Sequence, residues 1–390
     1  MNRRILALAG AGALLAAAAP MAQAAEAVKI GMITTLSGGG SGLGIDIRDG
    51  FQLAIDQEGG KLGGHAVELL VEDDGRKPDR AKEISDRMVK RDAVDIMTGI
   101  VWSNLAIAVV PKVTKAGVFY VSPNAGPSLL AGKGCHPNYF NVAWQNDNLH
   151  EAVGKHVKDQ GYKNVYILAP NYPAGKDALS GFKRFYGGAL AGEVYTKLGQ
   201  KDYAAEIATL RDAKPDAVFF FLPGGMGISF LKQYSQAGLM DEIPVFGPAF
   251  SFDQTILAAV GDAAIGIVNS SQWNRDIDNA ANKAFVADFQ KAYGRLPSLY
   301  ASQGYDAARL IGSALKAVGG DMSQADAFRA ALKTADFESV RGPFKFGPNH
   351  HPIQDIYVRR VVKDGDVLTN EILEKAFTGH ADAYAAECSM

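Results

Sequence analysis

The stretch KIGMITTLSGGGSGLGIDIRDGFQLAI, residues 29–55, indicates the fold class. Val28–Ile33 forms an apolar run typical of a buried strand, and Gly44–Gln57 has the spacing of an amphipathic helix. The glycine-rich turn between them fits neither G-x-G-x-x-G nor the Walker pattern, because Ile45 stands where the Walker pattern requires lysine. The stretch therefore predicts a strand–turn–helix unit whose glycines let a ligand lie against the backbone, with no phosphate implied.

The same alternation of strands and helices continues along the chain in two series. Strands rich in Val, Ile and Phe, divided by helix-length segments, indicate parallel sheets covered on both faces. In the second series a helix is expected over Lys176–Leu190 and a strand over Val194–Leu198. Because 390 residues exceed what one core usually supports, we expect an α/β protein with two doubly wound lobes. Ligands of such sheets sit beyond the carboxyl ends of the strands.

The N-terminus has the features of a secretory signal peptide. The basic residues Arg3 and Arg4 precede the apolar run Ile5–Ala19, and residues 22–24 read AQA, a cleavage signature. The apolar run is shorter than the ~20 residues that a membrane-spanning helix needs. We expect cleavage after Ala24 and export of the mature protein. The formal charge of −2 argues against nucleic acid or an anionic membrane as partner.

The cysteine count and the missing motifs limit which redox, metal and catalytic sites the chain can contain. The two cysteines, Cys135 and Cys388, are too few for a C-x-x-C redox site or a cysteine-based zinc site, and in an oxidising compartment we expect them to be bonded. H-E-x-x-H and G-x-S-x-G do not occur. Residues 72–74 and the pair His350-His351 are expected in solvated loops. We therefore expect no catalytic activity, no metal and no cofactor.

Turns at the predicted strand ends form a candidate binding site without Lys or Arg. In GIVWSN, Ser103 either caps the following helix or, with the free N–H groups of that helix, binds a carboxylate. The turn SPNAG adds Asn124, Ala125 and Gly126, whose small side chains allow a ligand to approach the backbone. A single aromatic residue is more often core than site, but several at strand ends favour a site. Aromatic residues recur at such turns: Trp102, Trp144, Tyr172, Phe250 and Trp273.

Five segments stand in an order and spacing typical of one protein family: IGMITTLSG, GHAVELLVEDDGRKPDRA, VFYVSPNAG, YKNVYILAPNYPAGKDALSGFK and GDAAIGIV. Together they resemble the type I periplasmic solute-binding proteins of ABC importers, the leucine/isoleucine/valine-binding family, over essentially the whole mature chain. The resemblance implies two lobes joined by three hinge crossings, near 143–147, 269–273 and 347–355, with the ligand in the cleft between them.

The resemblance also implies a domain organisation and partners. A signal peptide (1–24) is followed by lobe 1 (25–144 plus 274–352) and lobe 2 (145–273 plus 353–390). A monomer in the periplasm that delivers its ligand to the membrane permease of an ABC importer is expected. An exported signalling receptor of the same fold is the alternative, and an enzyme is disfavoured by the missing catalytic motifs.

In that family the turns matching Ser103 and Asn124–Gly126 hold the ligand carboxylate. The sequence departs from amino-acid binders because Ala249 replaces the acidic residue that receives the ligand ammonium. Gly126 likewise replaces a hydroxyl residue, and Leu43 an aromatic one. These differences favour an aromatic carboxylate, such as a benzoate or phenylpropenoate, over the alternatives of a branched-chain amino acid or keto acid. The candidate ligand-binding residues are Ser37, Gly38, Leu43, Trp102, Ser103, Asn124, Ala125, Gly126, Tyr172, Leu222, Pro223, Ala249 and Phe250.

Overall fold

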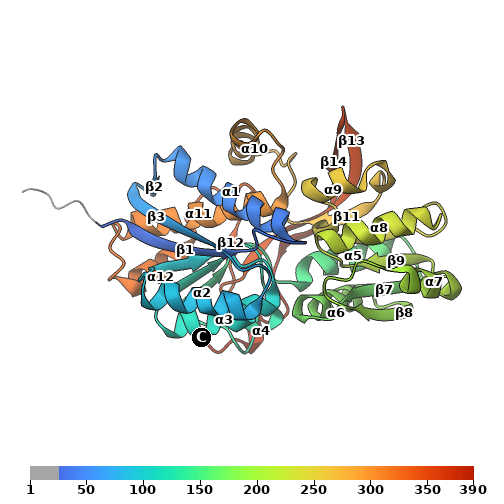
Figure 1. Ribbon diagram of the computed structural model, residues 1–390, viewed down its shortest axis with the longest axis horizontal. Helices are drawn as coiled ribbons and strands as arrows, with labels where there is room; N and C mark the ends of the chain where they lie inside the picture. Colours follow the sequence, from blue (N-terminus) through green and yellow to red (C-terminus); the bar gives the residue numbers. More distant parts are fainter. Residues whose placement is uncertain (1–25) are drawn as a thin grey trace, which may run out of the picture.

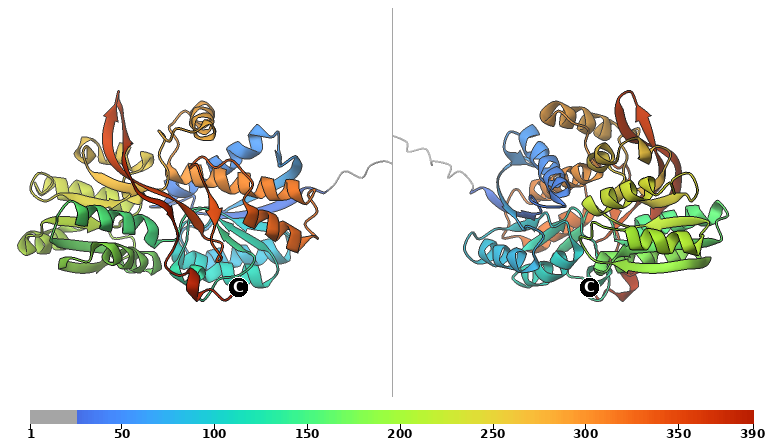
Figure 2. Two further views of the ribbon diagram at one scale, coloured as in Figure 1. Left: turned by 180° about the vertical axis from the view of Figure 1, so that it is seen from behind. Right: turned by 45° about the vertical axis from the view of Figure 1, so that its right-hand side comes forward.

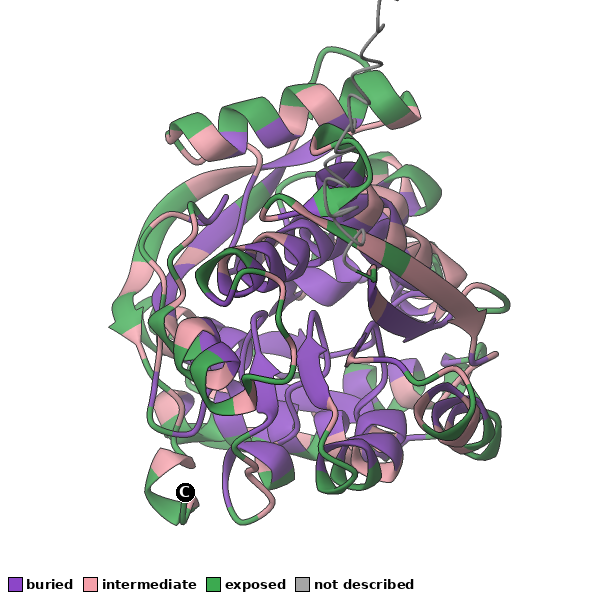
Figure 3. Ribbon diagram, turned by 90° about the vertical axis from the view of Figure 1, so that its left-hand side faces the viewer, coloured by how far each residue is buried: buried purple, intermediate pink, exposed green. Residues whose placement is uncertain are grey.

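A computed structural model describes residues 26–390 of the chain. The predicted signal peptide, 1–24, lies outside the described residues. Two lobes are built on two sheets (Figure 1). Figure 3 shows that buried residues concentrate in the strands and on the inner faces of the helices. Within the described range, no helix is long and apolar enough to cross a membrane.

The first lobe is a six-stranded sheet in the order β2-β3-β1-β4-β5-β6. Its strands are parallel except β2, and the strand order reverses beside β1, which pairs with both β3 and β4. Helices α1 and α11 pack together on one face and α2 and α3 on the other (Figure 1). The strands are β1 Val28–Thr34, β2 Lys61–Leu62, β3 His65–Asp73, β4 Ile96–Thr98, β5 Phe119–Ser122 and β6 Tyr139–Asn141. The helices are α1 Ser41–Gln57, α2 Pro78–Lys90, α3 Ser103–Lys115, α4 Ser128–Ala131, α10 Ala280–Tyr293, α11 Leu299–Ala317 and α12 Ala325–Thr334.

The second lobe is built on a sheet in the order β12-β13-β11-β10-β9-β7-β8, with β14 paired to β13. Strands β7 to β11 are parallel, while β13 and β14 form a long antiparallel hairpin that projects from the molecule (Figure 2). The strands are β7 Asn164–Pro170, β8 Ala189–Thr196, β9 Ala217–Phe220, β10 Val245–Pro248, β11 Val268–Ser271, β12 Lys345–Phe346, β13 Pro352–Asp364 and β14 Val367–His380. The helices are α5 Asp147–Asp159, α6 Pro173–Tyr186, α7 Ala204–Ala213, α8 Gly225–Gln236 and α9 Gln254–Val260, with 3-10 turns at Ala249–Ser251, Asp262–Ala264 and Ala385–Glu387. The two doubly wound α/β lobes expected from the sequence are confirmed.

One predicted boundary in the second lobe is wrong. Helix α6 ends at Tyr186 instead of Leu190, because Gly187 adopts φ 62° and closes the helix in the left-handed region. Strand β8 consequently begins at Ala189, five residues before the predicted Val194. The helices α5 and α12 and the strand β14 were not predicted either.

Two buried arginines fasten the segments that connect the lobes. The guanidinium of Arg341 donates to the carbonyl oxygen of Ala143 (3.0 Å), to the side chain of Gln354 (2.8 Å) and to Asp306 in α11 (2.9 Å). The guanidinium of Arg359 donates to the carbonyl oxygen of Trp273 (3.1 Å). Each arginine therefore ties β13 or the segment before it to another connection between the lobes.

The expected disulfide is present. Cys135 and Cys388 are bonded, with their Cα atoms 5.7 Å apart. The bond fastens the C-terminal end of the chain to the first lobe, beside which the C-terminus lies in Figure 1. In the same tail, the Tyr384 hydroxyl donates to Asp147 at the start of α5 (2.9 Å), so the tail contacts both lobes.

Two expectations of solvated loops are wrong. His350 and His351 are buried, and the His350 ring stacks on Phe140 with ring centroids 4.0 Å apart. Asp74 is also buried, and it accepts a hydrogen bond from the hydroxyl of Thr35 at 2.7 Å. In both cases distant segments cover a turn whose local sequence is polar.

Candidate ligand-binding site

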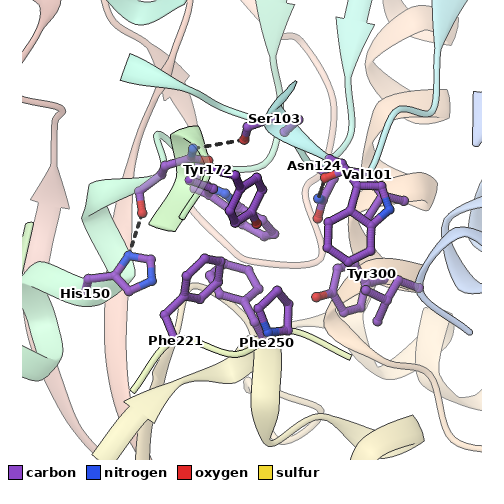
Figure 4. Close-up of a pocket in the computed structure, with 15 residues that line it drawn as sticks. Val101, Ser103, Asn124, His150, Tyr172, Phe221, Phe250 and Tyr300 are labelled. Carbon is purple, nitrogen blue, oxygen red and sulfur yellow. Dashed lines mark hydrogen bonds between the residues drawn. The ribbon is translucent and has the colours of Figure 1, made fainter. Parts of the chain in front are cut away.

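A cavity lies between the lobes, where the loops after β1, β4 and β5 face the loops after β7, β9 and β10 (Figure 4). These loops follow the carboxyl ends of parallel strands, beside the reversals of strand order in each sheet. The cavity is lined by Leu43, Val101, Trp102, Ser103, Asn124, Ala125, Trp144, Asn146, His150, Tyr172, Ala174, Phe221, Pro223, Phe250 and Tyr300.

Most of the predicted binding residues line this cavity. Those that do are Leu43, Trp102, Ser103, Asn124, Ala125, Tyr172, Pro223 and Phe250. Those that do not are Ser37, Gly38, Gly126, Leu222 and Ala249. Ser37 is exposed and donates its hydroxyl to Asp73 (2.6 Å). A Cβ at Gly126 would lie 2.1 Å from the carbonyl oxygen of Trp144, so this glycine is required for close packing against the connection between the lobes.

The glycine-rich turn accommodates a tryptophan of the cavity wall. A Cβ at Gly40 would lie 2.5 Å from the indole of Trp102. The indole Nε1 donates to Thr35 (3.0 Å), whose hydroxyl donates to the buried carboxylate of Asp74 (2.7 Å). Burial raises the pKa of Asp74, while the hydrogen bond from Thr35 opposes that rise. The turn thus fixes the orientation of Trp102, and Ser37 and Gly38 remain outside the cavity.

Aromatic side chains from both lobes form flat apolar walls. The rings of Tyr172 and Phe221 are nearly parallel, at 11° and 6.3 Å between centroids. Phe250 meets Phe221 edge to face at 5.5 Å, and Trp102 of the first lobe lies 6.4 Å from Tyr172. Such walls suit a planar apolar group, because offset-stacked and edge-to-face ring contacts are favourable.

Several lining residues were missed by the sequence analysis: Val101, Asn146, His150, Ala174, Phe221 and Tyr300. Trp144 was noted only as an aromatic residue at a turn. Phe221 could have been found, because side chains alternate along an extended segment and the predicted neighbour Leu222 is fully buried outside the cavity. Tyr300 lies in α11, far along the chain from the predicted turns.

Two helix N-termini meet the cavity and favour an anionic group there. Helix α3 begins at Ser103 and α6 at Pro173, and Ser103 and Ala174 line the cavity. Free N–H groups and the helix dipole attract a carboxylate at such a position. The Ser103 oxygen accepts a hydrogen bond from Asn146 (3.0 Å), which leaves the hydroxyl hydrogen free to donate to a ligand.

The other polar groups of the cavity are neutral. Burial lowers the pKa of His150 to about 4, so its ring is uncharged at neutral pH. Burial likewise raises the pKa of the Tyr172 and Tyr300 hydroxyls, which stay protonated. Asn124 donates to the carbonyl oxygen of Val101 (2.6 Å). The lining residues include no acidic side chain to receive a ligand ammonium.

The lobes contact each other beside the cavity. The N–H of Ser128 (3.0 Å) and its hydroxyl (2.7 Å) both donate to Asp177 in α6. The N–H of Gly225 in α8 donates to the carbonyl oxygen of Gly39 in the glycine-rich turn (3.4 Å). These contacts join segments of different lobes, so the structure is a closed form of the molecule.

Comparison with known proteins agrees with this architecture. Residues 27–366 match the family described as Periplasmic binding protein. An ABC-transporter solute-binding protein of R. palustris in complex with benzoate is 33% identical, with a TM-score of 0.88 and coverage of 94% of this chain and 100% of that one. A second, from R. palustris in complex with 4-hydroxybenzoate, is 28% identical, with a TM-score of 0.86 and coverage of 92% and 99%.

Comparison with proteins of similar sequence agrees with the structural comparison. The Leu/Ile/Val-binding protein homolog 6 of Brucella melitensis biotype 1 is 28% identical over 359 residues, which are 89% of this chain and 91% of that protein. The family match, the two-lobed fold and the cavity between the lobes agree with one another. The chain therefore belongs to the periplasmic binding protein family of ABC-transporter solute-binding proteins, which are binding proteins for transport and not enzymes.

Proposed function

We propose that this protein captures a small aromatic carboxylate, of the benzoate or phenylpropenoate class, in the periplasm and delivers it to the permease of an ABC importer. The observation that carries the proposal is a cavity with flat aromatic walls, two helix N-termini and no acidic side chain among its lining residues. The similarity to a solute-binding protein with bound benzoate supports the same ligand class.

The carboxylate of the ligand binds at the start of α3 in this proposal. There the Ser103 hydroxyl and the backbone N–H of Asn124 supply donors, and the positive end of the helix dipole faces the anion. The ring lies between Trp102 and the wall formed by Tyr172, Phe221 and Phe250. Stacked or edge-to-face rings add ~0.5–1.5 kcal/mol each beyond the area they bury.

An α-amino acid fits this cavity poorly. Its ammonium group would be buried without a carboxylate partner, which costs several kcal/mol, and each ~1.4 kcal/mol lowers affinity about tenfold. A branched aliphatic keto acid lacks the ammonium and is the competing ligand, since a relative of the chain is named for leucine, isoleucine and valine binding. Such a ligand would leave the flat aromatic walls without a planar partner.

Ligand capture uses the contacts between the lobes. A ligand that touches both lobes shifts the population toward the closed form, which is the form the permease must distinguish from the open one. We propose that the protein acts as a monomer, with residues 25–144 and 274–352 in lobe 1 and residues 145–273 and 353–390 in lobe 2. An importer role, rather than a signalling one, predicts permease and ATPase genes beside its own gene.

Calorimetry tests the ligand class. Wild-type protein is titrated with benzoate-type acids, a phenylpropenoate, leucine and the keto acid of leucine. Aromatic acids should bind most tightly, and tight leucine binding without aromatic binding would refute the proposal. Trp102→Ala should weaken the aromatic acids most, Ser103→Ala should weaken every carboxylate alike, and Ser313→Ala on α11, whose hydroxyl bonds only within its helix, serves as a control.

A further inference from the structure

The cavity wall holds a hydrogen-bond acceptor that no described residue satisfies. His150 lies in α5 and is 1% exposed. Its Nδ1 is 2.7 Å from the carbonyl oxygen of Asn146, which can only accept, so Nδ1 carries the proton. The neutral ring then presents a lone pair at Nε2, and this atom is buried without a partner among residues 26–390.

The ring of His150 is held in place and faces the cavity. Its edge approaches Phe221 at 84° and 5.0 Å between centroids, and it tilts against Phe250 at 5.8 Å. In Figure 4 the hydrogen bond to Asn146 leaves from one side of the ring, and the other ring nitrogen points toward the space enclosed by Tyr172, Phe221 and Phe250. Phe221 and Phe250 carry no N–H or O–H donor, and the hydroxyl of Tyr172 forms no hydrogen bond with Nε2.

A buried acceptor without a donor is unfavourable, and the cavity suggests what satisfies it. A water molecule needs two to four polar partners, while the surroundings of Nε2 are largely aromatic. The occupant of the cavity is therefore the natural source of the donor. A phenolic hydroxyl suits the position, because it is flat, uncharged at neutral pH and a good hydrogen-bond donor.

We infer that the preferred ligand is a ring-hydroxylated aromatic carboxylate whose hydroxyl donates a hydrogen bond to Nε2 of His150. This inference rests on the proposed function and narrows it. Asn146 connects the two recognition points, since its side chain bonds Ser103 at 3.0 Å and its carbonyl oxygen orients His150. The carboxylate is held at the start of α3 and the hydroxyl at α5, so the distance between the two groups on the ring selects the isomer.

The test compares ligands that differ in one donor. Wild-type protein is titrated by calorimetry with benzoate, the three monohydroxybenzoates and the methyl ether of each. One hydroxybenzoate should bind at least tenfold more tightly than benzoate and than its own methyl ether, because the ether has no hydrogen to donate. Equal affinity for benzoate and all hydroxybenzoates would overturn the inference while leaving the proposed function intact. If no aromatic acid binds, both are wrong.

Variants of His150 test whether this residue causes the preference for a hydroxybenzoate over benzoate. His150→Phe should bring the ratio of hydroxybenzoate to benzoate affinity close to one, and His150→Gln, which keeps an acceptor, should retain part of it. A preference unchanged in His150→Phe would overturn the assignment. If that variant does not fold, wild-type titrations in buffers of different ionisation enthalpy decide. No proton uptake should accompany hydroxybenzoate binding at pH 7.5, whereas uptake of one proton would mean that a charged His150 binds the carboxylate instead.

Discussion

The contact between Ser128 and Asp177 gives a direct test of closure, because it joins the two lobes outside the cavity. Ser128 begins α4 of the first lobe, and both its N–H (3.0 Å) and its hydroxyl (2.7 Å) donate to Asp177 of the second. Asp177 also accepts from Asn146 (2.9 Å). Ser128→Ala removes the hydroxyl and leaves the other two donors. Neither residue lines the cavity, so the ligand loses no contact.

The magnitude follows from the charge of the acceptor. A hydrogen bond to a charged group contributes ~1.5–3 kcal/mol, and this one exists only while the lobes are together. Since each ~1.4 kcal/mol is a factor of ten, Ser128→Ala should weaken binding of every ligand by roughly 10- to 150-fold. The free energy of unfolding of the ligand-free open form should change little, because Ser128 is solvated there.

Calorimetry with a verified ligand measures the effect, and Ser323→Ala is the matched control. Ser323 likewise donates its N–H (3.0 Å) and its hydroxyl (2.6 Å) to one carboxylate, that of Asp321, but the pair is exposed and lies within one lobe. Ser323→Ala should leave the affinity unchanged. Wild-type affinity in Ser128→Ala, or an equal loss in both variants, would refute the reasoning that closure is coupled to binding.

Four further predictions follow from the fold. Arg341→Met should lower the free energy of unfolding by ~3–5 kcal/mol in urea titrations, because the carboxylate of Asp306 stays buried without the guanidinium that pairs with it. Arg360→Met, which breaks an exposed ion pair, should lower the free energy of unfolding by less than ~1 kcal/mol. Equal losses in the two variants would contradict the prediction. Burial lowers the pKa of His150 to about 4, so the folded protein binds a proton there less readily than the unfolded chain, and the free energy of unfolding falls as the pH drops from 6.5 toward 4. Between pH 7 and 5, wild type should lose roughly 2 kcal/mol more of this free energy than His150→Phe. Parallel pH profiles of the two proteins would contradict this prediction. Cys388→Ser opens a loop of 253 residues and should lower stability by at most about 5 kcal/mol, with no further change on adding reductant; a denaturation midpoint equal to that of oxidised wild type would count against the bond. Small-angle scattering should show a smaller radius of gyration with saturating ligand, and an unchanged radius would argue against lobe closure.

Periodicity and local turn chemistry largely determine the architecture. Helix α3 begins at Ser103, where the sequence analysis expected a helix to start, and its apolar stripe defines it locally. The alternative that Ser103 caps this helix is wrong, because Trp102 is the N-cap and no side chain caps α3. The limit of helix α6 was missed, because Gly187 ends it through its left-handed backbone conformation and the apolar pattern continues into β8. The polar turn at Asp74 was misassigned for a different reason, since it is buried by contacts with Thr35 across the sheet.

Some residues of the candidate site could likewise be predicted from the sequence, and others could not. Ser103, Asn124 and Tyr172 could be named from the sequence, because each follows a predicted strand and parallel strands bring their carboxyl ends to one edge. His150 and Tyr300 could not, because both lie in amphipathic helices where a buried polar residue looks the same whether it faces the core or a cavity. The unpartnered nitrogen of His150 lies opposite the start of α3 at Ser103 only because α5 packs against the second sheet and the two lobes approach each other. That approach depends on contacts between residues far apart in the chain, and no local pattern encodes it.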